Sequence, residues 1–159
     1  MNQRIFDSPI GRLLLSTKDG RLCEIRRVEY GEAKHADDPI LDEVQKQLDE
    51  YFSGRRMAFS LPLEIEGTAF ERAVWQQLVQ IPFGSVMTYG QLAAKLGMPK
   101  AARAVGRACS RNPLLIVVPC HRVIAGTGKL TGFAAGMQAK RVLLEKEGWT
   151  IQDDRVVKE

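Results

Sequence analysis

Residues 114–124 read LLIVVPCHRVI, an apolar run of five residues followed by proline, cysteine, histidine and arginine. The apolar run predicts a buried segment that carries Cys120 toward the interior of the protein. A thiol is a good nucleophile only as the thiolate, which a neighbouring imidazole and guanidinium favour. Because His121 and Arg122 directly follow it, we expect Cys120 to be an activated nucleophile.

The chain around Cys120 has no acidic residue from position 72 to position 144. This window of 73 residues contains ten Lys or Arg, whereas the overall frequency of 19 acids in 159 residues would place about nine Asp or Glu in it. Residues 1–67 carry a net charge of −3, and residues 68–159 a net charge of +7. A reactive cysteine in a basic region favours a reaction on a polyanion such as nucleic acid, with a solvated basic surface as the alternative.

The composition is that of an ordinary globular protein, with 45% hydrophobic and 26% charged residues in a chain of 159. Three widely spaced cysteines and two histidines form no Cys-x-x-Cys pair, which argues against a structural zinc site. A free nucleophilic thiol indicates a reducing compartment, and no apolar stretch is long enough for a signal peptide or a membrane span. We therefore expect a cytoplasmic protein with no metal and no membrane association.

The first half of the sequence predicts an antiparallel sheet followed by one helix. Short segments between turn residues indicate strands at residues 4–6 and 12–17, and residues 21–28 alternate apolar and polar side chains as a third strand does. Apolar residues at helical spacing between 40 and 52, followed by Gly54, predict the helix. Together they make a small N-terminal α/β domain over residues 1–66, with residues 61–67 as the linker.

The second half, residues 67–159, predicts a mainly helical domain, so the fold class is α+β. Thr68 followed by Glu71 is a capping box that opens a helix. Two further short helices, at residues 89–96 and 100–110, flank a turn that contains glycine and proline. This spacing is typical of a winged-helix-like helix-turn-helix that binds DNA, and ordinary helix packing is the alternative.

The most specific pattern is the joint spacing of several short motifs in the second half. They are Tyr89, AARAVG at 101–106, Asn-Pro at 112–113, Pro-Cys-His-Arg-Val at 119–123, Gly132, Gly136, Lys140 and Glu147-Gly148. With this pattern the chain resembles the O6-alkylguanine-DNA alkyltransferases, also called methylated-DNA–protein-cysteine methyltransferases. The resemblance covers the C-terminal domain almost end to end, and the first half is similar to the family's small N-terminal α/β domain.

The resemblance implies a DNA repair protein that needs no cofactor. It would bind duplex DNA in the minor groove and rotate an O6-alkylguanine, and also an O4-alkylthymine, out of the base stack. The alkyl group would then pass irreversibly to Cys120 in a single turnover. Extrusion is the usual way to expose an atom of a paired base, and a thiolate is suited to attack at carbon. We expect a monomer, with cooperative binding along DNA left open.

The resemblance also assigns roles in catalysis. Cys120 is the acceptor, His121 the general base acting through a bridging water, and Glu147 the carboxylate that holds the imidazole in the correct tautomer. Asn112 braces the active-site segment, with a simple Asn-Pro turn as the alternative. Glu145 is interpreted as a surface charge.

For DNA binding, the resemblance makes Arg103 a finger that fills the space left by the flipped nucleotide. Tyr89 would contact the backbone phosphate and the flipped base, with a half-buried aromatic anchor as the alternative. Arg122 is expected to pin the active-site turn rather than touch DNA. Small residues in the minor groove and cations at phosphates complete this predicted set: Ala101, Ala102, Ala104 and Gly106, with Lys100 and Arg107.

The predicted substrate pocket combines residues before and after the nucleophile: Tyr89, Cys109, Val123, Phe133, Ala134 and Ala135. Phe133 supplies an apolar wall, and the backbone N–H of Ala134 would bind the guanine oxygen. The methyl group of Ala135, where the family often has glycine, would narrow the pocket lip for bulky adducts. For Cys109 a small apolar filler is the favoured interpretation.

Two other functions are consistent with parts of the sequence. A DNA-binding protein without transfer activity, either an alkyl-lesion sensor or a regulator, would explain the basic helices, but lesion-sensing relatives replace the cysteine. A cysteine hydrolase would explain Cys120 and would leave the basic helix without a role. Single-turnover alkyl transfer accounts for all these features and is the function that the sequence predicts.

Overall fold

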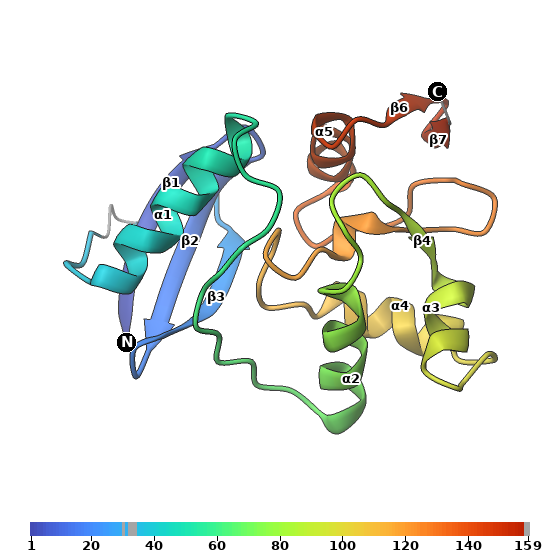
Figure 1. Cartoon of the computed structure of the whole chain (residues 1–159), viewed down its shortest axis with the longest axis horizontal. Helices are drawn as coiled ribbons and strands as arrows, with labels where there is room; N and C mark the ends of the chain where they lie inside the picture. Colours follow the sequence, from blue (N-terminus) through green and yellow to red (C-terminus); the bar gives the residue numbers. More distant parts are fainter. Residues whose placement is uncertain (30, 32–34, 158–159) are drawn as a thin grey trace.

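The computed structural model describes residues 1–29, 31 and 35–157 of the chain. Its first part is an antiparallel sheet in the order β1 (Asn2–Ser8), β2 (Gly11–Lys18) and β3 (Arg21–Arg27). Helix α1 (Pro39–Phe52) covers one face of this sheet (Figure 1). The predicted strands and helix of the first half are thus confirmed.

The outer edge of β3 is paired with two later segments. Leu22 forms a parallel bridge with Leu63, so the segment predicted as a linker adds to the sheet edge. Further along, the N–H of Ile25 donates to the carbonyl of Pro113 at 2.8 Å, and the carbonyl of Ile25 accepts from Leu115 at 3.2 Å. The apolar run that leads to the nucleophile is therefore held by the N-terminal sheet.

The second part consists of short helices and short strand pairs. In chain order its elements are α2 (Ala69–Leu78), β4 (Met87–Thr88), α3 (Tyr89–Lys95), α4 (Ala102–Ser110), the 3₁₀ turn η1 (Cys120–Arg122), β5 (Val123–Ile124), α5 (Met137–Lys146), β6 (Thr150–Gln152) and β7 (Arg155–Val157). The capping box of Thr68 and Glu71 is present with both of its hydrogen bonds. The helix expected from residue 100 begins at Ala102, because the backbone from Met98 to Ala101 forms a turn.

A short parallel pairing brings the start of α3 next to the nucleophile. Met87 pairs with Val123 and Thr88 with Ile124, so β4 and β5 lie side by side. Tyr89 directly follows β4, and Cys120 stands shortly before β5. Two residues 31 positions apart in the sequence are thus brought to one region of the fold.

One hydrophobic core extends through both parts of the molecule. Leu13 and Leu15 of the sheet belong to the same buried cluster as Trp75 of α2 and Cys120. The indole N–H of Trp75 donates to the carbonyl of Ala108 at 2.9 Å and so ties α2 to α4. Among the residues that the structure describes, no helix is long and apolar enough to cross a membrane.

Gly136 stands at the start of α5, where the preceding loop turns into the helix. Its φ of +97° and ψ of +159° lie in a region that is open almost only to glycine. A Cβ atom here would also approach Nη1 of Arg27 to 3.7 Å. The residue therefore fixes the direction in which the loop meets α5.

We expect Gly136→Ala to lower the free energy of unfolding by roughly 2 kcal/mol, because alanine cannot adopt this conformation without strain. Urea unfolding followed by circular dichroism measures the change. Gly126→Ala is the matched control, since Gly126 lacks a positive φ and has open space around its Cβ position. Equal stabilities of the two variants would contradict the argument.

Candidate active site

The thiol of Cys120 is buried, with the residue only 4% exposed, and opens the turn η1. The side chain of Asn112 lies against it: Nδ2 donates to Sγ of Cys120 at 3.1 Å and to the carbonyl of Val118 at 2.7 Å. Its Oδ1 accepts from the N–H of Leu114 at 2.9 Å. Asn112 therefore contacts both the apolar run and the nucleophile, which is the position that the bracing role requires.

The electrostatic surroundings of the thiol differ from the sequence-based expectation. Burial raises the pKa of Cys120 to about 11, against the lowering effects of the Asn112 hydrogen bond and the Lys140 charge. The guanidinium of Arg122 binds the carboxylate of Glu147 and the carbonyl of Ile81. The expectation that Arg122 favours the thiolate was wrong, because the 3₁₀ turn directs its guanidinium to that carboxylate, whereas the role of His121 stays a prediction.

The carboxylate of Glu147 is the centre of a buried polar cluster. Nε2 of His121 lies 2.8 Å from its Oε2, and Arg122 donates from Nε at 2.7 Å to Oε1 and from Nη2 at 3.0 Å to Oε2. The hydroxyl of Tyr51 donates to Oε2 at 2.6 Å. Burial opposes the charged form, but these hydrogen bonds outweigh it and hold the pKa of Glu147 at about 2.

The charged carboxylate determines which nitrogen of His121 carries hydrogen. An ionised carboxylate only accepts hydrogen bonds, so Nε2 is the protonated nitrogen and Nδ1 keeps a free lone pair. Burial lowers the pKa of His121 and so keeps the ring neutral, whereas Glu147 acts in the opposite direction. Nδ1 is buried and has no hydrogen-bond partner among the described residues. The arrangement provides a buried neutral imidazole whose Nδ1 can accept a proton.

Lys140 of α5 is fully buried, and its ammonium group is the cation that acts on the thiol. Nζ donates to the carbonyl of Val123 at 2.6 Å and lies 3.4 Å from that of Thr131. Burial lowers its pKa to about 8, and the two thiols Cys109 and Cys120 oppose this shift. Sequence reasoning assigned Lys140 no role, although helical spacing places it on the same face as the buried Leu143, Leu144 and Glu147.

A cavity of about 590 Å³ opens between α4 and the loop before α5. Its lining residues are Tyr89, Ala102, Arg103, Gly106, Ser110, Thr131, Gly132, Phe133 and Ala134. The hydroxyls of Tyr89 and Thr131 share a hydrogen bond of 2.6 Å across the cavity wall. Tyr89, Phe133 and Ala134 of the predicted pocket line this cavity, and Cys120 is not among its lining residues. Thr131 is a wall residue that the sequence did not indicate.

Three predicted pocket residues lie outside this lining. Val123, Cys109 and Ala135 are 0%, 6% and 2% exposed. The methyl group of Ala135 does not narrow the mouth, because the residue is turned inward and its carbonyl accepts from Nη1 of Arg27 at 2.9 Å. Cys109 fills the core beside the nucleophile, as the apolar-filler interpretation held.

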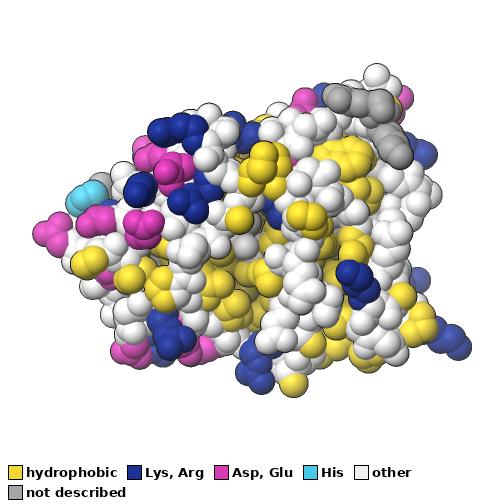
Figure 2. Space-filling model, viewed as in Figure 1, with side chains coloured by type: hydrophobic (Ala, Val, Ile, Leu, Met, Phe, Trp, Pro, Cys, Tyr) yellow, Lys and Arg dark blue, Asp and Glu magenta, His cyan; other side chains and the backbone are white. Residues whose placement is uncertain are grey.

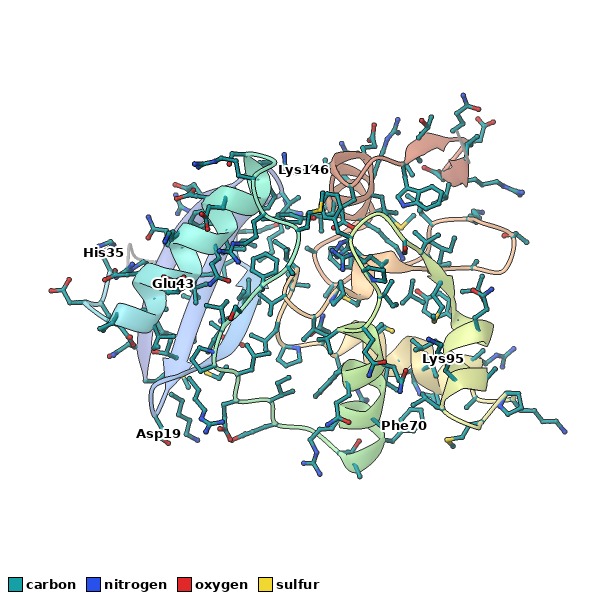
Figure 3. All side chains as sticks on the ribbon, viewed as in Figure 1. Asp19, His35, Glu43, Phe70, Lys95 and Lys146 are labelled. Atoms are coloured by element: carbon teal, nitrogen blue, oxygen red, sulfur yellow. The ribbon has the colours of Figure 1, made fainter. Side chains whose placement is uncertain are left out.

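The outer surface of α3 and α4 is basic. Its exposed cations are Lys95, Lys100, Arg103, Arg107 and Arg111. Arg111 has a partner, Glu71, at 3.5 Å. Acidic side chains gather instead over the sheet and α1 (Figure 2). Lys95 lies on the opposite side of the molecule from His35 and Glu43 (Figure 3).

Both halves of the chain match profiles of one protein family. Residues 1–65 match the 6-O-methylguanine DNA methyltransferase, ribonuclease-like domain, and residues 69–149 match the 6-O-methylguanine DNA methyltransferase, DNA binding domain. The chain belongs to this family. The methyltransferase family also includes the methylated-DNA–protein-cysteine methyltransferase of Methanosarcina acetivorans, which is 42% identical over 154 residues, or 93% of this chain and 99% of that protein.

Two solved structures are similar to this chain over different shares of its length. OGT of Mycobacterium tuberculosis in complex with DNA has a TM-score of 0.85 and 41% identity, covering 92% of this chain and 93% of that one. Atl1 of S. pombe, in complex with damaged DNA containing O6-carboxymethylguanine, has a TM-score of 0.50 and 37% identity over 55% of this chain and 82% of its own. The mixed α/β fold with an N-terminal antiparallel sheet is thus the fold of the family.

The low pKa of Glu147 makes stability depend on acid pH. Because its pKa falls from an ordinary 4.5 to about 2 on folding, the charge stabilises the native state above about pH 4.5. This contribution disappears as the pH falls toward 2. Between pH 4.5 and pH 2 we expect the free energy of unfolding to fall by roughly 3 kcal/mol more in the wild type than in Glu147→Gln. Chemical denaturation at a series of pH values measures this difference.

Glu147→Gln should also be the less stable protein at pH 7, since it leaves the buried Arg122 without its charge partner. Glu145→Gln serves as the control, because Glu145 is exposed and pairs with Arg141 on the helix surface. The idea fails if Glu147→Gln keeps the full acid dependence of the wild type.

Proposed function

We propose that this chain repairs DNA by direct dealkylation, binding duplex DNA, flipping out an O6-alkylguanine and transferring its alkyl group to Cys120. Sγ attacks the alkyl carbon, the bond between that carbon and O6 breaks, and guanine leaves with the electron pair. The thioether is permanent, so each molecule reacts once. The observation that carries this proposal is the buried series Cys120, His121 and Glu147 in a member of this family, with Asn112 on the thiol and Glu147 on the imidazole. Tyr89, whose hydroxyl interacts electrostatically with Cys120, lines the pocket next to the basic helix α4.

Because burial raises the pKa of the thiol to about 11, its proton has to be removed within the site. Nδ1 of His121 is the base, and it takes the proton through one water. Glu147 holds the tautomer that leaves Nδ1 free, and the ammonium group of Lys140 stabilises the thiolate. Tyr89 lines the pocket, where its hydroxyl donates to the departing base.

Helices α3 and α4 act as a winged-helix-like helix-turn-helix that enters the minor groove. Arg103 lines the pocket and is exposed, which suits a side chain that replaces the flipped base in the stack. The small residues of α4 and its first turn allow close approach to the groove, and cations at both ends contact phosphates: Ala101, Ala102, Ala104 and Gly106, with Lys100 and Arg107. Binding that avoids base-specific contacts suits a lesion that occurs in any sequence.

The chain is further proposed to consist of an N-terminal domain, residues 1–66, and an alkyl-acceptor domain, residues 67–159. The junction between the two family profiles supports this boundary. The protein acts as a monomer in the cytoplasm, where its three free cysteines stay reduced. O4-alkylthymine is a second substrate, because it presents the same kind of alkyl–oxygen bond to the sulfur.

A lesion sensor without transfer activity is the second candidate. It draws on the likeness to Atl1, whose structure contains DNA with O6-carboxymethylguanine. The presence of Cys120, held by Asn112 and placed beside a neutral histidine, favours transfer over sensing.

Intact-protein mass spectrometry after mixing with a duplex that carries one O6-methylguanine tests the proposal. We expect a gain of one methyl group per protein that saturates at one equivalent and maps to the peptide containing Cys120. Cys120→Ala should bind the duplex and gain nothing, whereas Cys109→Ala should still react. Tight lesion binding by the wild type with no gain in mass would identify a sensor.

Arg103→Ala should slow transfer from duplex DNA at least about tenfold, while the rate with free O6-methylguanine base changes less than about twofold. The reason is that the finger stabilises the extruded state, which the free base does not need. Arg107→Ala is the matched control, because Arg107 lies exposed on the same helix outside the pocket lining. Arg107→Ala should weaken DNA binding without a large difference in transfer rate between duplex and free base. Equal slowing of transfer from both substrates in Arg103→Ala would rule out the finger role.

A further inference from the structure

The buried carboxylate of Glu147 has one donor that comes from the N-terminal half of the chain. Tyr51 stands near the end of α1 and is 1% exposed, and its hydroxyl lies 2.6 Å from Oε2. The same oxygen accepts from Nε2 of His121 at 2.8 Å. Tyr51 lies outside residues 69–149, the part that matches the DNA-binding profile. The catalytic carboxylate is therefore completed by a residue from the other half of the protein.

The tyrosine ring is held by aromatic packing that directs its hydroxyl. Its ring centroid lies 5.2 Å from that of Phe52, 5.6 Å from Phe59 and 6.3 Å from Phe83. Burial, followed by the charge of Glu147, raises the pKa of Tyr51 far above its usual range. The phenol therefore stays protonated and acts as a permanent donor to the carboxylate.

We propose that Tyr51 is a positioning residue for alkyl transfer, which shares Oε2 of Glu147 with His121 and thereby keeps the imidazole neutral with Nδ1 free. This role rests on the proposed function. Nη2 of Arg122 donates to the same oxygen at 3.0 Å, so Oε2 serves three donors, and an oxygen that serves three attracts each of them less strongly than one that serves two. Without the phenol, Glu147 would stabilise the protonated imidazole more strongly. Nδ1 of His121 would therefore already be protonated, and unable to act as a base, at a higher pH than in the wild type.

The other groups that face the imidazole determine the direction of this effect. Glu147, which follows α5, favours the protonated form of the imidazole, whereas Arg122 of η1 and Lys140 of α5 disfavour it. From the loop before α5 the nearest ring is that of Phe133, which is uncharged, at 6.4 Å between centroids. From α1 the hydroxyl of Tyr51 reaches the same carboxylate. Removal of this hydroxyl leaves Arg122 still bound to both carboxylate oxygens. Glu147 thus stays ionised when the phenol is lost.

Tyr51→Phe tests the proposal, because it removes the hydroxyl and keeps the aromatic packing. The single-turnover rate of methyl transfer from an O6-methylguanine duplex is measured from pH 5 to pH 9. We expect the acidic limb of the profile to move to higher pH, so that the rate below the midpoint falls roughly three- to tenfold and the alkaline plateau changes less than about twofold. An unmoved midpoint, or an equal loss of rate at all pH values, would overturn the proposal.

Phe59→Leu is the matched control, since it disturbs the packing around Tyr51 and removes no donor. It should lower the melting temperature without moving the midpoint, and an equal shift in both variants would reduce Tyr51 to a packing role. The imidazole titration of His121, followed by NMR on the folded protein, gives a readout that needs no transfer. Its midpoint should rise in Tyr51→Phe. If the wild type transfers no methyl group, the proposed function fails, and this titration still decides the part played by Tyr51.

Discussion

The buried negative charge of Glu147 is the constraint on which the rest of the site depends. The residue caps the C-terminal end of α5, where the helix dipole disfavours an anion. A carboxylate in this position is stable only because three side chains donate to it. Each donor is thereby fixed in place. The imidazole of His121 is held in one tautomer, the guanidinium of Arg122 is bound to the carboxylate, and the phenol of Tyr51 links the N-terminal half to Glu147.

This arrangement makes the N-terminal half part of the support of the site. Ile25 holds the apolar run that precedes the nucleophile, Arg27 binds the carbonyl of Ala135 behind the pocket loop, and Tyr51 reaches the carboxylate. One continuous core joins these contacts. The two halves match separate profiles, yet the carboxylate of Glu147 accepts hydrogen bonds from both.

Local signals allowed much of the fold to be predicted from the sequence. Alternation identified the strands, helical spacing and the Thr68–Glu71 capping box identified the helices, and the family pattern selected Glu147 over the exposed Glu145. The misses arise from contacts between residues far apart in the chain. Nothing near Tyr51 indicates its partner 96 positions away, and adjacency in sequence suggested that Arg122 would act on the thiol when the 3₁₀ turn directs it elsewhere.

The pairing of Ile25 with Pro113 and Leu115 also bears on the fate of the reacted protein. An alkyl group on the buried sulfur needs space in a segment that is packed on all sides, and the simplest relief is a displacement of the run before it. Such a displacement would uncover the hydrogen-bonding groups of β3, turning a covered strand into an open sheet edge. The contact that positions the nucleophile is thus also the one that an alkyl group on the sulfur would strain.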